Sequence, residues 1–173
     1  MFKKLAAIGL VLALTGCASG VKVADNAHRQ FITTQPANAI SISLTDDAKK
    51  KLSDNMKFNQ TALLEQVKRA LTAKNMLNEN QAGPMNTIEI VVKDMRVRSS
   101  FTAVMFGFMA GNDSLTGDVV LKDVQGKELN RFEVSASYAL GGLAGGQDES
   151  RMNWLYEKFA EHTVENLGGT AKN

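Results

Sequence analysis

The sequence predicts one α+β domain, a two-layer sandwich in which an antiparallel-dominated four-stranded sheet carries helices on one face, in the order β-α-β-β-β-α. Four segments alternate apolar and polar residues with a period of two, which is typical of half-buried strands. Two longer segments repeat apolar residues every three or four positions, which is typical of amphipathic helices. Because each strand has one polar face, we expect the helices to cover only one side of the sheet.

The first half of the predicted domain contains one strand and one long helix. Residues 39–44 alternate strictly and predict the first strand. The charged stretch 45–57 predicts a short helix that begins after Thr45 or Asp46. Asn59 is suited to cap the long helix, because its side-chain oxygen can accept from a free amide of the first turn. The apolar stripe of that helix consists of Leu63, Leu64, Val67, Ala70 and Leu71.

The second half supplies three more strands. Residues 87–98 predict one whose apolar residues change face midway, so we expect a β-bulge near Lys93 and Asp94. Residues 115–122 and 128–140 predict a hairpin. Its turn contains Gly126, which can adopt a positive φ without steric cost.

A final helix is predicted from Asp148 or Ser150 to Leu167, where two glycines end it. Its buried stripe comprises Met152, Leu155, Tyr156, Phe159, Thr163 and Leu167. Trp154 falls on nearly the opposite side. The spacing therefore predicts that Trp154 either contacts a partner or rests on a neighbouring loop.

The N-terminus reads as an export signal over residues 1–16. Lys3 and Lys4 precede the apolar run 5–14, which is too short for a permanent transmembrane helix of about 20 residues. The last three residues of this signal and the residue that follows it read Leu14-Thr15-Gly16-Cys17. They resemble the lipobox of bacterial lipoproteins.

That resemblance implies that diacylglycerol alkylates the Cys17 thiol, that the chain is cut before Cys17 and that the new amino group is acylated. Three acyl chains give stable anchoring, whereas one gives only marginal binding. Ala18 follows Cys17 in place of the Asp that retains such proteins in the inner membrane, so the resemblance favours the periplasmic face of the outer membrane. The alternative is an ordinary cleaved signal that leaves Cys17 as a thiol.

Length and charge bound the mature protein. Removing 16 of 173 residues leaves 157, the size of one domain. We predict a lipidated tether over 17–36, the folded domain over 37–169 and a disordered tail over 170–173. The cut also removes two lysines, which leaves 18 basic against 18 acidic side chains. This balance argues against a nucleic-acid partner, since it provides no general basic field.

Residues 88–167 also resemble a proteobacterial lipoprotein family of unknown function. Four features carry the resemblance, namely the strand Met95-Arg96-Val97-Arg98, the aromatic and glycine segment 105–111, the strand and turn 119–127, and the glycine loop followed by the C-terminal helix. The predicted architecture is also similar to that of small periplasmic domains of envelope lipoproteins. Neither resemblance implies an activity.

Residue types that support catalysis or metal binding are sparse. The two histidines are His28, in the predicted tether, and His162, which the helix spacing places on a solvated face. Neither has a partner at zinc-ligand spacing, and there is one cysteine. The glycines of 141–146 lack the Lys and Ser/Thr of a phosphate-binding loop, so they favour a flexible connection over a ligand site. We expect no enzymatic activity, cofactor or metal.

The predicted hairpin brings two apolar stretches, 101–110 and 139–146, to the end of the sheet opposite its charged turn. Ten nearly uncharged residues are unusual in a connection. They indicate either a buried element that completes the core or an exposed patch for self-association, a protein partner or the membrane. The candidate interaction surface consists of Phe101, Met105, Phe106, Phe108, Met109, Leu140 and Leu143.

These observations favour a non-enzymatic envelope lipoprotein, anchored through Cys17, that acts as an accessory or assembly factor through protein contacts or self-association. The alternative from another class is a small-molecule or lipid-binding module with an apolar pocket near residues 101–110 and 139–146. A tethered hydrolase is the least favoured hypothesis.

Overall fold

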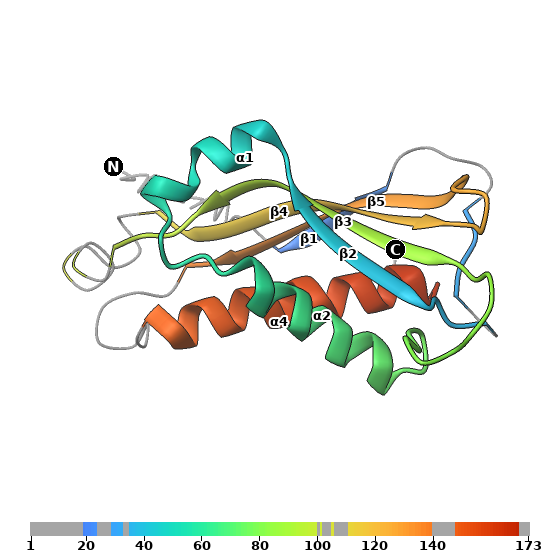
Figure 1. Ribbon diagram of the computed structural model, residues 1–173. Coiled ribbons are helices and arrows are strands. Elements are labelled where there is room, and N and C mark those ends of the chain that lie inside the picture. The colour runs from blue at the N-terminus through green and yellow to red at the C-terminus, as the bar shows by residue number, and fades with distance from the viewer. Residues whose placement is uncertain are drawn as a thin grey trace, which may run out of the picture.

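Five strands form one mixed sheet in the order β1-β5-β4-β3-β2 (Figure 1). The computed structural model describes residues 19–23, 29–32, 35–99, 101, 105, 111–139 and 148–169. The strands are β1 (Gly20–Val23), β2 (Ala39–Leu44), β3 (Thr87–Arg96), β4 (Asp113–Lys122) and β5 (Glu128–Tyr138). The helices are α1 (Asp46–Lys50), the 3-10 helix η1 (Leu52–Asp54), α2 (Gln60–Ala73) and α4 (Asp148–Leu167).

The predicted α+β class is confirmed, but the prediction of four strands is wrong. The additional strand, β1, comes from the segment interpreted as a tether, and it pairs antiparallel with β5, where Gly20 lies opposite Ser135. Four residues are too few to show a convincing alternation. Strand β1 is added at the sheet edge, where β5 offers unpaired backbone groups, and that pairing leaves no periodic signal in the sequence.

The sheet is mixed because β2 and β3 run parallel, whereas the other three pairings are antiparallel. Parallel neighbours need a crossover connection, and α1, η1 and α2 provide it. Both predicted helix starts are present. The Oγ1 of Thr45 accepts from the N–H of Ala48 at 3.2 Å, and the Oδ1 of Asn59 accepts from the N–H of Ala62 at 3.0 Å.

The predicted bulge and turn are confirmed. The β3–β4 register shifts between Val92 and Asp94, so Val92 and Met95 are both buried although their spacing is odd. In the β4–β5 turn, Gly126 has φ +80°, and the carboxylate of Asp123 accepts backbone N–H bonds from Gln125 and Lys127 at 2.9 and 2.8 Å.

Helices α2 and α4 lie side by side along one face of the sheet and enclose the core with it (Figure 1). The short α1 packs apart from them against β2 and β3. All six predicted stripe residues of α4 are buried, as are Leu63, Val67 and Leu71 of α2. Within the described residues, no helix combines the length and apolar character needed to cross a membrane.

The opposite face of the sheet carries ion pairs between neighbouring strands. The Nζ of Lys93 on β3 donates to Asp118 on β4 at 2.9 Å and also to Glu133 on β5. Arg131 binds Asp118 at 3.4 Å from the other side. This face is consistent with the predicted polar side of the strands.

Candidate interaction surface at one end of the sheet

A buried ion network lies at the end of the sheet opposite the β4–β5 turn. The Asp113 carboxylate at the start of β4 accepts from Arg98 Nη2 at 3.0 Å and from Arg151 Nη1 at 2.8 Å. Its Oδ1 also accepts the backbone N–H of Arg98 at 2.7 Å. Arg151 extends the network by donating to Asp148, which Lys57 approaches at 3.4 Å.

The two arginines and two aspartates of the network balance in charge, and Lys57 adds a cation at its exposed margin. The side chains of Arg98, Asp113 and Arg151 are 1%, 0% and 1% exposed. With Asp148, two guanidinium groups face two carboxylates. Such burial carries a large desolvation cost, so the geometry must supply nearly complete pairing. We conclude that this cluster is a buried support in which two guanidinium groups share Asp113, while the buried Arg151 Nε has no hydrogen-bond partner among the described residues.

This support joins four parts of the fold. Arg98 follows β3, Asp113 begins β4, and Arg98 Nη2 also donates to the carbonyl of Tyr138 at the end of β5, at 3.3 Å. Arg151 comes from the first turn of α4 and donates to the Arg98 carbonyl at 3.2 Å. The network therefore fixes the residues that flank both apolar stretches predicted from the sequence.

Gly111 makes the close approach of one further arginine possible. It has φ +81°, and a Cβ at this position would overlap the guanidinium of Arg96. The positive φ favours a glycine there, and any larger residue would also have to displace the end of the flexible Arg96 side chain. The segment that leads into β4 is thus fitted against β3 at its last residue.

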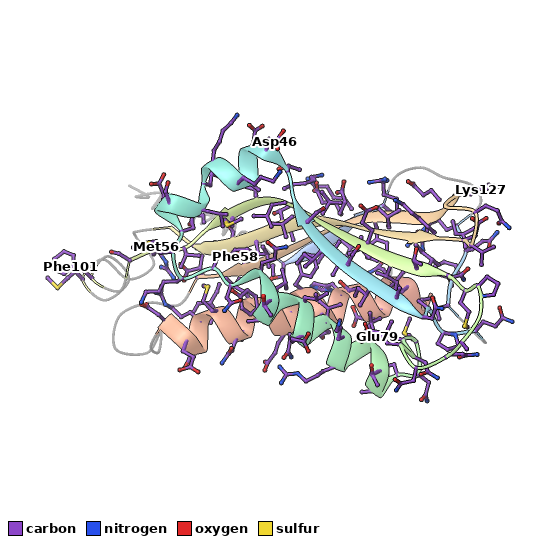
Figure 2. All side chains as sticks on the ribbon, viewed as in Figure 1. Asp46, Met56, Phe58, Glu79, Phe101 and Lys127 are labelled. Atoms are coloured by element: carbon purple, nitrogen blue, oxygen red, sulfur yellow. The ribbon has the colours of Figure 1, made fainter. Side chains whose placement is uncertain are left out.

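Phe101 and Met105, two members of the predicted surface, are 69% and 63% exposed. Their side chains therefore do not complete the core, and Figure 2 shows Phe101 projecting beyond the end of the sheet. The other predicted members, Phe106, Phe108, Met109, Leu140 and Leu143, lie outside the described residues. The glycine loop 141–146 lies outside them too.

Met56 is an exposed apolar residue that the sequence reasoning missed. It is 87% exposed and lies at the same end of the molecule as Phe101, away from Lys127 (Figure 2). Its neighbour Asn55 holds it there, because the buried Asn55 amide accepts from the N–H of Val97 at 2.6 Å and donates to the Lys51 carbonyl at 2.7 Å. Met56 interrupts a polar stretch, and that was its only signal in the sequence. We name Met56, Phe101 and Met105 the apolar end.

The N-terminal strand brings the chain to this end as well. Ser19 precedes β1, and its Oγ accepts from the backbone N–H of Ser137 at 2.9 Å, near the end of β5. Asn112 donates to the Ser137 Oγ at 3.1 Å. Cys17 lies outside the described residues, two positions before Ser19.

Two predictions about α4 need correction. Trp154 was expected at a partner or over a loop, but its ring packs against that of Tyr138, with centroids 5.1 Å apart, and so secures the end of β5. His162 was expected on a solvated face, but its side chain is 20% exposed. Its Nδ1 lies 3.4 Å from Glu165, and its Nε2 is buried without a hydrogen-bond partner among the described residues.

Where the structure describes the chain, no group of three His, Cys, Asp or Glu side chains is arranged to hold an ion. His28 lies outside that part.

Taken together, the fold and this end define a small α+β sandwich with an exposed apolar end built on a buried, charge-balanced support. The chain belongs to the family described as "Domain of unknown function (DUF4410)", which matches residues 20–142. The match runs from β1 through β5 and includes Arg98, Asp113 and the apolar end.

Solved structures with a similar fold include the PelC dodecamer from Paraburkholderia phytofirmans, in space group P6, and a point variant of it in space group C2. Each has a TM-score of 0.50 and 11% sequence identity, and the alignment covers 87% of this chain and 99% or 98% of the other. At this identity the likeness shows the fold alone. No curated protein matches the chain.

Proposed function

We propose that this chain is a lipid-anchored envelope lipoprotein without enzymatic activity, held at the periplasmic face of the outer membrane through Cys17. It works there as an accessory or assembly factor through protein contacts. The lipobox-like Leu14-Thr15-Gly16-Cys17 supports the anchor, and Ala18 after the cysteine supports the choice of membrane.

The observation that carries the proposal of an anchored protein that works through contacts, with the membrane or with a protein, is the apolar end itself. Phe101, Met105 and Met56 are large, exposed and apolar, and they stand beside a support whose charged groups neutralise one another. Large apolar side chains exposed at one end of a fold mark a surface for contact with a protein or a membrane. The base favours contact over chemistry, because the Asp113 carboxylate already accepts hydrogen bonds from both Arg98 and Arg151.

Self-association is the first protein contact to test. The similar fold of PelC occurs in a dodecamer, which supports assembly of this chain with copies of itself.

The anchor is tested by metabolic labelling. Cells that express the full chain are grown in the presence of a labelled fatty acid. We expect the label on the wild-type chain and its loss in Cys17→Ala, while Ser19→Ala keeps it. Mass spectrometry of the purified protein should show three acyl chains and no residues 1–16. An unmodified thiol on a chain that retains its leader would refute the anchor.

The assembly role is tested by crosslinking in cells, followed by mass spectrometry of the crosslinked species. We expect either a ladder of the chain with itself or a reproducible partner protein. A monomer that copurifies with a bound lipid or small molecule would instead support the ligand-binding alternative.

A further inference from the structure

We infer that the apolar end lies against the lipid bilayer, with Phe101, Met105 and Met56 at the depth of the headgroups. This inference rests on the proposed lipid anchor and names what the apolar end contacts. The protein contacts of the proposed function are then left to the sides of the domain.

The path of the N-terminal chain is the first step. Ser19 is fixed to β5 by its bond with the backbone of Ser137, and β1 continues that pairing from Gly20. Two residues separate Ser19 from Cys17, a reach of about 7 Å even when fully extended. An acylated Cys17 therefore lies within about 7 Å of this edge of the sheet.

The sheet register places the apolar end on the same side. Ser137 pairs with Ser114 on β4, and Ser114 pairs with Arg96 on β3. Two interstrand steps span only about 10 Å. Arg96 lies five residues before Phe101, and Asn55 ties the Met56 segment to Val97, the residue after Arg96. The anchor point and the apolar end thus share one end of the domain.

The short tether fixes which end faces the membrane. Strand β5 has 11 residues and is therefore about 36 Å long. A tether of about 7 Å cannot let such a domain turn so that the Lys127 end meets the bilayer instead. The anchor therefore also brings the exposed side chains at the Ser19 end to the lipid surface.

The chemistry of this end suits lipid. Phe and Met bury a large area and carry no charge, and amphipathic surfaces of this kind settle about 5–10 Å into the boundary between headgroups and acyl chains. Arg98 and Arg151 are buried on Asp113, and Lys57 lies 3.4 Å from Asp148. The contact between the apolar end and the bilayer should therefore be mainly apolar. We expect it to form on zwitterionic vesicles that contain no anionic lipid.

The experiment uses the full lipoprotein, purified with its acyl chains and reconstituted into phosphatidylcholine vesicles that contain a lipid-borne spin-label quencher. An environment-sensitive fluorophore is attached at Phe101→Cys and, separately, at Met56→Cys. Lys127→Cys at the opposite end is the matched control. We expect a blue shift and loss of most of the fluorescence at positions 101 and 56, and neither at position 127.

Flotation and mass spectrometry of the same samples separate two kinds of failure. An unacylated chain that does not float with the vesicles overturns the anchor and the inference with it. A chain that is acylated and floats while its probes at 101 and 56 stay unquenched overturns the inference alone. Blue-shifted but unquenched probes would assign the apolar end to a protein contact, which also overturns it. Thermal unfolding of each labelled variant checks that the fold is intact. If one of the variants at 101 and 56 does not fold, the other still tests the inference.

Discussion

Arg98 and Asp113 close the segment that contains Phe101 and Met105. The Asp113 carboxylate accepts both the backbone N–H of Arg98, at 2.7 Å, and its guanidinium, at 3.0 Å. The two residues are 15 positions apart, yet this contact holds them at hydrogen-bond distance in the interior. The exposed apolar residues between them therefore project from a base that is set by the core.

The first prediction concerns the removal of charge from this base. Asp113→Asn keeps the shape of the side chain but leaves two buried guanidinium groups without their shared carboxylate. We expect the free energy of unfolding to fall by about 3–5 kcal/mol, the usual effect of breaking a buried ion pair. Urea unfolding measures it.

The matched control is Asp47→Asn, because Asp47 also pairs with a cation, Lys50 at 2.9 Å, but does so in solvent. Its effect should stay below about 1 kcal/mol. Equal effects of the two substitutions would show that the buried network contributes no more than a surface ion pair.

The second prediction compares two glycines with nearly the same backbone conformation. Gly111 has φ +81° and Gly126 has φ +80°, so alanine at either position carries a conformational cost of about 1–2 kcal/mol. Only at Gly111 would the new Cβ also meet Arg96, whereas nothing lies within 4 Å at Gly126. Because the end of the Arg96 side chain is flexible and exposed, Gly111→Ala should destabilise the protein only slightly more than Gly126→Ala in thermal unfolding. A much larger loss at Gly111 would mean that Arg96 cannot move aside.

The third prediction concerns the ion pairs on the open face of the sheet. The hydrogen bond from Lys93 lowers the pKa of Glu133 below its usual range, and hydrogen bonds to Asp118 and Glu133 raise the pKa of Lys93. Because the folded pKa of Glu133 lies below its unfolded value, its contribution is present above the unfolded pKa and is lost as pH falls through the folded pKa.

Lys93→Met should accordingly cost up to about 1 kcal/mol at neutral pH, since these groups are partly exposed. The difference from wild type should shrink in acid and in high salt. Lys127→Met, in the exposed turn, is the control and should change little. A Lys93→Met effect that is constant from neutral pH into acid would assign its cost to packing of the lysine stem.

The sequence predicted the local elements well because their signals are local. The alternation of residues 39–44, the parity change near Lys93 and the cap at Asn59 each depend on neighbours along the chain, and each is confirmed. Strand β1 was missed because its pairing partner, Phe132 opposite Val23, is more than a hundred residues away. The candidate surface was predicted in part, since Phe101 and Met105 are exposed.

The buried network was missed because its members read as ordinary surface charges. Arg98 and Asp113 flank an apolar segment, where charges are expected to be solvated. Arg151 did give a signal, because it lies four residues before Leu155 and eight before Phe159 and so continues the buried stripe of α4. A charged residue on such a stripe indicates a buried partner, but the sequence does not show that Asp113 is that partner.

The last prediction concerns the contact between α4 and the start of α2. The buried Tyr156 hydroxyl accepts the backbone N–H of Asn59 at 2.8 Å, and Asn59 in turn caps α2 through Ala62. Tyr156→Phe leaves that N–H without this acceptor, so we expect a loss of about 1–3 kcal/mol in the free energy of unfolding.

The same tyrosine makes stability depend on alkaline pH. Burial raises the pKa of Tyr156 above its ordinary value near 10, although the bond from Asn59 opposes the shift. A folded pKa above the unfolded one means that the folded state retains the proton longer. The contribution is therefore complete below the unfolded pKa and declines as pH rises from there through the folded pKa. The difference between wild type and Tyr156→Phe, measured by urea unfolding from pH 8 upward, should shrink above about pH 10. A difference that stays constant across that range would mean that the hydroxyl titrates alike in the folded and unfolded chains.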